Sequence, residues 1–287
     1  MERIPTALPP KTGRSSRFIQ YTHVCCVLIM ALLTTCGLTA MAAPIDVSIY
    51  ADEDYPPYSY VENGQLKGIY KEILTGAFKK MPKYNVHLIP VPWKRGLSVL
   101  ETGEGFALYP PYYRPTERPY MQYSNPIFTE LVVVFCNEAA IAKKQLKMWP
   151  DDYFGLSIGM NSGFLSGGPK FDQAVKAKKV RLDSSATSRS NLLKLLVGRI
   201  DCYVNDKLMI ESEYKKIKSE PNFAARPLSI QETSEVSTEL VFLGYTNRDG
   251  GRYAFKNDFI QEFNIAIASM KQTGEIAKIT NSFLDNN

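Results

Sequence analysis

The sequence predicts an α/β protein made of two lobes that share strands at a hinge. Strand-like and helix-like segments alternate from Ile45 to about Pro110, which is the pattern of a largely parallel sheet. A second alternating set begins at Glu130. No low-complexity linker separates the two sets, and the sequence contains no internal repeat. The chain is long enough for two lobes, each with its own core.

The first set begins with the alternating strand "IDVSIYA" and a turn-rich loop whose hairpin tip is Asn63–Gly64. Ile69, Ile73 and Ala77 then follow at helical spacing. The set continues with a strand, a short helix that Gly103 ends, and a third strand, in the stretches "NVHLIPV", "WKRGLSVLETG" and "FALYP".

The second set begins with the β-branched strand "ELVVVF" and continues through "LSIGM", a helix and "VRL". A helix over residues 188–197, the strand "IDCYVND" and the helix "KLMIESEYKKI" follow. A further strand, "ELVFLGYT", starts at Glu239. A long helix then carries apolar side chains four residues apart, and a last helix follows Gly274.

Residues 1–42 have the pattern of a cleavable signal peptide. A basic start is followed by an apolar run from Val24 to about Ala43, and Ala40-Met41-Ala42 is an A-x-A site. We therefore expect cleavage after Ala42 and a periplasmic protein. An uncleaved anchor, a lipid-modified Cys36 and a start codon downstream of Met1 remain alternatives.

Composition excludes several classes of function. The leader contains four basic residues and one acidic residue, so its removal lowers the net charge from +5 to +2, which argues against a nucleic-acid partner. Only His87 remains to serve a zinc site or a histidine triad. Cys136 and Cys202 lie in apolar strand-like runs. We predict two buried free thiols, with a disulfide as the alternative in an oxidising compartment.

Five motifs, in this order, resemble the family-3 bacterial solute-binding proteins, the polar-amino-acid type of periplasmic binding protein. They are "YPPYSYVENGQLKGIYKEIL", "PWKRGLSVLETG", "PTERPYMQYSNPIF", "GRIDCYVND" and "MKQTGEIAKITNSFL". The resemblance implies the type II fold, two lobes joined by two hinge strands, in a monomer that closes over a ligand. The expected parts are a signal peptide (1–42), lobe 1 (43–130 and 233–287) and lobe 2 (131–232).

The resemblance also implies ligand-binding residues. Arg118 of "TER" would clamp a ligand carboxylate, with Thr116 beside it, because a guanidinium matches a carboxylate in two-pronged geometry. The alternative is that Arg118 pairs with a surface acid, and Arg114 is a second candidate for the clamp. Asp206 follows a buried strand and would bind a ligand amine, cap the next helix, or do both.

Aromatic side chains complete the expected site. Tyr58 and Trp93 are candidates for its walls, with plain core packing as the alternative. Tyr55, Tyr112 and Arg95 are weaker candidates. The family's second-lobe Gly-Ser or Gly-Thr is replaced here by Gly163 followed by Phe164. One carboxylate donor is therefore lost, and Ser162 or the backbone amides near Gly163 could replace it.

These features predict a non-catalytic binding protein that delivers an amino acid or a similar zwitterion to an ABC-type membrane transporter, without a cofactor. A sensory or partner-binding module on the same fold is an alternative. A dehydratase-like enzyme is a further alternative. Its general acid would be Glu53, Asp54 or Glu72.

Overall fold

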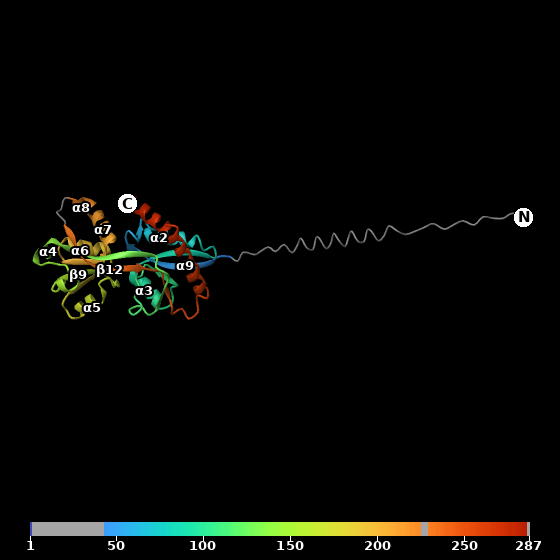
Figure 1. Cartoon of the computed structure of the whole chain (residues 1–287), viewed down its shortest axis with the longest axis horizontal. Coiled ribbons are helices and arrows are strands. Elements are labelled where there is room, and N and C mark those ends of the chain that lie inside the picture. The colour runs from blue at the N-terminus through green and yellow to red at the C-terminus, as the bar shows by residue number, and fades with distance from the viewer. Residues whose placement is uncertain (2–42, 225–228, 286–287) are drawn as a thin grey trace. The chain divides into compact units, whose positions relative to one another are not determined.

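Two five-stranded sheets organise the chain (Figure 1). The computed structural model describes Met1 and residues 43–224 and 229–285. The predicted cleavage site and Cys36 lie outside the described residues. In the first sheet the strand order is β5 (Tyr84–Val91), β1 (Ile45–Asp52), β6 (Ala107–Tyr109), β13 (Gly244–Thr246) and β7 (Met121–Tyr123). In the second it is β10 (Arg181–Ser185), β9 (Ser157–Asn161), β11 (Cys202–Asp206), β8 (Phe128–Asn137) and β12 (Ile230–Val241).

Helices cover both sheets, in two groups that lie on opposite sides of Figure 1. The first group is α2 (Ile69–Phe78), α3 (Trp93–Glu101), α9 (Lys256–Gln272) and α10 (Glu275–Asp285). The second is α4 (Glu138–Lys143), α5 (Gly168–Lys176), α6 (Ser188–Leu196), α7 (Lys207–Ser219) and α8 (Pro221–Ala224), with a 3₁₀ turn at Asp151–Tyr153. No described helix is long and apolar enough to cross a membrane.

Strand pairing in the first sheet follows the predicted pattern. β1 pairs in parallel with β5 and β6, and β13 joins antiparallel between β6 and β7. The expected hairpin tip is present between β3 (Ser59–Glu62) and β4 (Gln65–Lys67), which form a small third sheet with β2 (Asp54–Tyr55). Asn63 and Gly64 have φ of 52° and 74° there, as a two-residue hairpin turn requires.

The two sheets are connected by two adjacent crossing segments. β7 leads into β8, and β12 leads into β13. β8 and β12 pair antiparallel, from Phe128 opposite Val241 to Asn137 opposite Ile230. The prediction of a two-lobe fold with two hinge strands is thus confirmed. The expected lobe boundaries, 130/131 and 232/233, fall inside this strand pair, and we retain them as a proposal.

One strand was placed wrongly from the sequence. The prediction was a single strand from Glu239, but the structure begins β12 at Ile230 and ends it at Val241, before β13. The missed part, "IQETSEVST", is mostly polar because β12 is the edge strand of its sheet, where side chains remain partly in water. Apolar alternation therefore gives no signal there.

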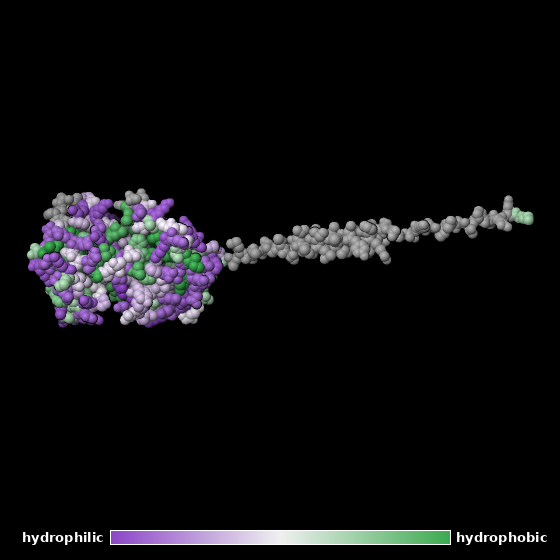
Figure 2. Space-filling view, in the orientation of Figure 1, coloured by the Kyte–Doolittle hydropathy of each residue, from purple (hydrophilic) through white to green (hydrophobic). Residues whose placement is uncertain are grey.

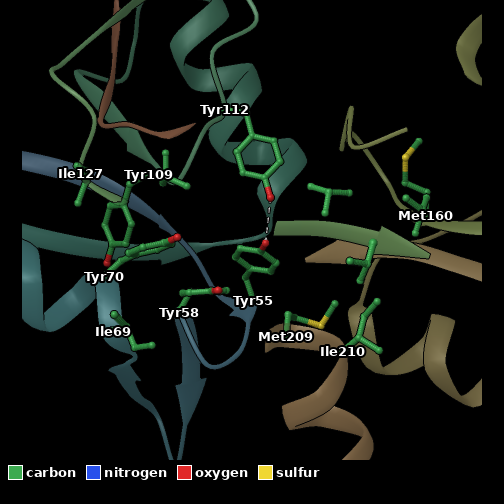
Figure 3. Packing of buried hydrophobic residues seen from close by; sticks show 14 of the residues in the cluster. Tyr55, Tyr58, Ile69, Tyr70, Tyr109, Tyr112, Ile127, Met160, Met209 and Ile210 are labelled. Atoms are coloured by element: carbon green, nitrogen blue, oxygen red, sulfur yellow. Dashed lines mark hydrogen bonds between the residues drawn. The ribbon is translucent and has the colours of Figure 1, made fainter. Parts of the chain in front are cut away.

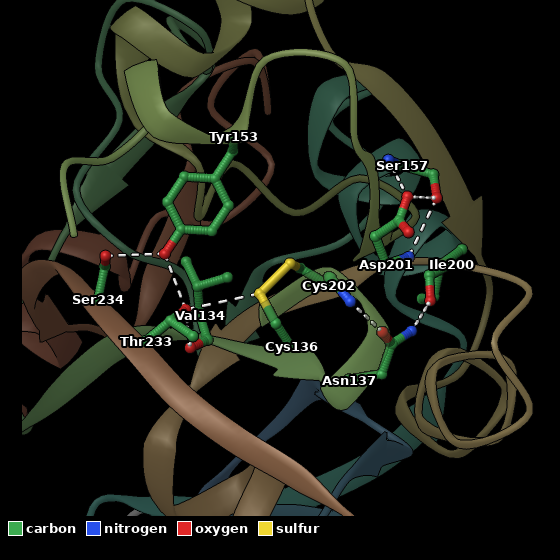
Figure 4. Close-up of a disulfide and its surroundings, with 11 residues drawn as sticks. Val134, Cys136, Asn137, Tyr153, Ser157, Ile200, Asp201, Cys202, Thr233 and Ser234 are labelled. Carbon is green, nitrogen blue, oxygen red and sulfur yellow. Dashed lines mark hydrogen bonds between the residues drawn. A yellow bond between two sulfur atoms is a disulfide. The ribbon is translucent and has the colours of Figure 1, made fainter. Parts of the chain in front are cut away.

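The prediction of free thiols was also wrong. Cys136 on β8 and Cys202 on β11 lie directly opposite each other, with Cα atoms 4.0 Å apart, and their sulfurs form a disulfide (Figure 4). Both side chains are fully buried. The apolar surroundings were read correctly, but a sequence does not reveal the register that places one cysteine across from the other.

We expect removal of this disulfide to lower stability by about 2–4 kcal/mol, because it closes a loop between residues 66 apart and so restricts the unfolded chain. The test is urea unfolding of the double variant Cys136→Ala/Cys202→Ala beside the wild-type protein, with and without reductant. The two proteins should coincide once the wild type is reduced. Two titratable thiols in the unfolded, unreduced wild type would contradict the assignment.

Candidate ligand-binding site

The candidate site lies where the carboxyl ends of β1, β5 and β6 approach the turn that follows β9. Ligands in open α/β sheets gather at such strand ends. Figure 2 shows the surface indented between the regions of α3 and α5. The structure leaves a cavity of about 20 Å³, lined by Asp52, Tyr55, Trp93, Pro110, Tyr112, Arg114, Arg118, Phe164, Leu165 and Ser166.

Arg118 presents its guanidinium to this cavity. The residue is only 5% exposed and makes no ion pair with any residue in the described part of the chain. Its Nη2 donates to the carbonyl oxygen of Gly163 at 3.1 Å, and its Cζ lies 5.4 Å from the centre of the Trp93 ring. Burial lowers the pKa of Arg118. A buried cation without an acid partner is well suited to an anionic group.

Arg114 lines the same cavity but is already paired. Its Nη1 and Nη2 donate to the two carboxylate oxygens of Glu239 on β12, at 3.0 and 2.8 Å. Nη2 also lies 3.4 Å from the carbonyl oxygen of Leu165. This two-pronged ion pair neutralises Arg114 and leaves Arg118 as the better placed clamp of the two.

The turn after β9 brings the second lobe into contact with Trp93. The amide of Phe164 donates to the carbonyl oxygen of Asn161, and Gly163 has φ of +84°, which is the position of glycine in a type II turn. Trp93 Nε1 donates to the Gly163 carbonyl oxygen at 3.3 Å. The Phe164 ring meets Tyr55 and Trp93 edge-on, with ring centres 5.5 and 5.9 Å apart.

Two polar residues that line the cavity were not predicted from the sequence. Asp52, the last residue of β1, is 3% exposed, and burial raises its pKa to about 8. Ser166 is 1% exposed, and its hydroxyl has no hydrogen-bond partner among the described residues. Ser166 is thus a second-lobe hydroxyl in the cavity lining, whereas the hydroxyl of Ser162 lies 3.2 Å from that of Ser184. The place of Asp52 at a strand end was the one available signal.

The buried carboxylate of Glu130 accepts hydrogen bonds from the two tyrosines that line the cavity. Tyr55 and Tyr112 each donate to Glu130 Oε2 at 2.5 Å, and Tyr70 donates to Oε1. Figure 3 shows Tyr55 and Tyr112 approaching from opposite sides with their hydroxyls together. Burial raises the pKa of Glu130 to about 8, although the tyrosine hydrogen bonds favour the ionised form. Because the hydroxyls of Tyr55 and Tyr112 donate to Glu130, these two residues line the cavity with their rings.

Asp206 belongs to the same buried cluster and does not line the cavity. Its Oδ1 accepts from the amide of Met209 at 2.9 Å, which makes it the N-cap of α7, and its Oδ2 accepts from Leu131. Burial raises its pKa to about 6, opposed by hydrogen bonds that include one from Tyr58. Tyr58 stacks on Tyr70 and is 2% exposed. Their roles as ligand contacts stay predictions.

The remaining candidates are spread around the site. Thr116 and Arg95 are exposed and do not line the cavity. Of the three possible general acids, Glu72 is exposed, Glu53 is half-buried, and Asp54 accepts from the amide of Ser188 at the start of α6. None of the three lines the cavity. Within the described ranges, no group of His, Cys, Asp and Glu residues is arranged to hold a metal ion.

Comparisons with known proteins agree with this fold. The family model described as bacterial extracellular solute-binding proteins, family 3, matches residues 47–286. Among solved structures, a histidine kinase sensor domain with similarity to periplasmic binding proteins is 15% identical, with a TM-score of 0.69; the match covers 84% of this chain and 96% of that one. The search among curated proteins finds no match.

Two further structures show the range of proteins with this fold. One, reported for glutathione import via GshT and the cystine ABC importer TcyBC of Streptococcus mutans, has a TM-score of 0.68, 17% identity and coverage of 85% and 96%. The other is an ancestral amino acid-binding protein, a precursor of cyclohexadienyl dehydratase, with a TM-score of 0.63, 18% identity and coverage of 83% and 94%. At such identities the likeness shows the fold alone.

The buried cluster predicts a pH dependence that Glu130→Gln should reduce. Because the pKa of Glu130 is raised, the stability that its neutral form contributes is fully present below about pH 4.5 and is lost as the pH rises through about 8. The variant, which cannot ionise, should flatten the fall in unfolding free energy between pH 5 and 8, by up to about 1.4 kcal/mol per pH unit. Asp52 contributes in the same window and remains.

Urea unfolding across this pH range measures the slope. The exposed Glu72→Gln is the matched control and should retain the wild-type slope. Equal slopes in Glu130→Gln and wild type would mean that Glu130 stays ionised in the folded protein.

Proposed function

We propose, because this chain belongs to the bacterial extracellular solute-binding proteins of family 3, that it captures an amino acid or a similar small zwitterion between its lobes. The observation that carries the proposal is Arg118, a buried guanidinium without an acid partner among the described residues, in the lining of an aromatic-walled cavity. Ser166 offers a hydroxyl to the same ligand carboxylate. The prolines of the Arg118 loop reduce the conformational entropy lost on binding.

The ligand amine has two candidate partners. Asp206 was the prediction from sequence, and its carboxylate is engaged by backbone amides and a tyrosine. Asp52 lines the cavity together with Arg118 and is the second candidate. A positive amine beside Asp52 would favour the ionised form of that carboxyl and compensate part of its burial cost.

We further propose that the protein is periplasmic after cleavage of residues 1–42, and that it delivers its ligand to an ABC-type transporter as a monomer. The similarity to a histidine kinase sensor domain supports one other candidate, a sensory module on the same fold. Catalysis is not part of the proposal, because the family that the chain belongs to is one of solute-binding proteins.

Arg118→Ala should weaken ligand binding about 10- to 100-fold, because a hydrogen-bonded charge pair contributes about 1.5–3 kcal/mol. Calorimetric titration with the best ligand of an amino-acid screen measures this loss. Arg181→Ala, an exposed arginine on β10, is the matched control. Unchanged affinity in Arg118→Ala would remove the clamp from the proposal.

Asp52→Asn should weaken binding of the amino acid roughly tenfold, but not that of its analogue without the amine, because only the amine needs the carboxylate charge. Asp206→Asn tests the rival cleanly, since asparagine preserves the N-cap of α7. If Asp206→Asn alone shows the amine-specific loss, the amine partner is Asp206 and the role of Asp52 is excluded.

A further inference from the structure

The turn that follows β9 offers the first lobe two groups that resemble parts of a ligand. The carbonyl oxygen of Gly163 accepts from both Arg118 Nη2 and Trp93 Nε1, at 3.1 and 3.3 Å. The next residue, Phe164, inserts its ring between Tyr55 and Trp93. An acceptor oxygen and an aromatic ring, joined through a short stretch of main chain, therefore fill the centre of the site.

The position of the Gly163 carbonyl oxygen suits a group that carries more negative charge than a carbonyl. Arg118 is buried and has no acid partner in the described part of the chain, so its charge is compensated by a neutral dipole. A carboxylate in the same place would accept the same two donors and neutralise the guanidinium. The hydroxyl of Ser166, which has no partner among the described residues, lines the same cavity.

The ring site is apolar and shaped for an aromatic group. Tyr55 and Tyr112 direct their hydroxyls to Glu130, so they give the cavity ring surface only. Edge-on contacts at 5.5 and 5.9 Å are the geometry that aromatic pairs prefer. Arg114 is neutralised by Glu239, which leaves no cationic group for an acidic ligand side chain.

The space left beside Phe164 is too small for any such ligand. A cavity of about 20 Å³ holds about one water molecule. A ligand of amino-acid size therefore has to move the turn away from Tyr55 and Trp93 as the lobes part. Gly163 is suited to this close approach, because a Cβ there would lie 3.3 Å from the Trp93 ring.

We propose that Gly163 and Phe164 form an internal substitute for the ligand, and that the ligand is a small carboxylate bearing an aromatic ring, such as an aromatic amino acid. This inference rests on the proposed function and narrows its ligand class. Phe164 is then a specificity-determining residue: it competes with ring-bearing ligands, and the measured affinity is reduced by the fraction of molecules in which the turn occupies the site.

The test uses protein purified from the periplasm of cells expressing the full chain. Only two tryptophans are present, and Trp149 does not line the cavity: it stacks on Phe171, and its Nε1 donates to the carbonyl oxygen of Gly167 at 2.8 Å. In a Trp149→Phe background, fluorescence therefore reports on Trp93 alone. The probes are phenylalanine, 3-phenylpropanoate (no amine), phenethylamine (no carboxylate) and glutamine (polar side chain). Phenylalanine and phenylpropanoate should bind more tightly than phenethylamine or glutamine.

Phe164→Ala should then raise the affinity for phenylalanine about tenfold, because the competing aromatic contacts are lost. Phe154→Ala, which removes a half-buried phenylalanine elsewhere in the second lobe, is the matched control and should leave the affinity unchanged.

Three results would overturn the inference. Weaker binding of phenylalanine in Phe164→Ala would make Phe164 a wall of the site and not a competitor. Binding of glutamine but not of the aromatic carboxylates would reject the ligand class while the proposed function stands. If calorimetry detects no binding of a full amino-acid set by the wild type or by Phe164→Ala, the proposed function fails together with the inference.

Discussion

The carboxylate of Glu130 is the point on which the geometry of the site depends. It lies on the hinge strand β8 and accepts hydrogen bonds from the hydroxyls of Tyr55, Tyr70 and Tyr112, which come from three separate segments of the first lobe. A carboxyl group buried this deeply would be costly without those donors. The same hydrogen bonds orient the rings of Tyr55 and Tyr112, so the walls of the cavity are set by a residue that does not line it.

Charge is distributed unevenly around this cluster. Asp206, Glu130 and Asp52 are all buried acids with raised pKa values, whereas Arg118 is a buried cation without an acid partner among the described residues. All three acids accept hydrogen bonds, Glu130 from tyrosine hydroxyls and Asp206 and Asp52 from backbone amides, which stabilise them locally. Arg118 and Asp52 both line the cavity, so a guanidinium and a carboxyl group whose pKa burial raises to about 8 lie in the same site.

The second lobe contacts the candidate site through a backbone carbonyl and an aromatic ring and, among the described residues, not through a charged side chain. Its turn at Gly163 meets the first lobe through a carbonyl oxygen and the ring of Phe164. The sheet behind that turn is cross-linked by the disulfide between β8 and β11, next to β9. A sheet fixed in this way favours movement of the lobes as units about the crossing segments over deformation within a lobe.

The sequence by itself determined most of the elements and the two α/β sets, because periodicity and turn residues act over a few residues. Its short motifs, through their resemblance to a family, indicated Arg118 as a clamp candidate. It did not determine which side chains contact one another across the fold. Tyr55 and Glu130 are 75 residues apart, and Cys136 and Cys202 are 66 apart. Asp52 looked like the end of an ordinary strand, and β12 lacked the apolar alternation of a half-buried strand. Only the tertiary structure decided which strand ends meet, since strand register and lobe contact arise from packing between distant segments.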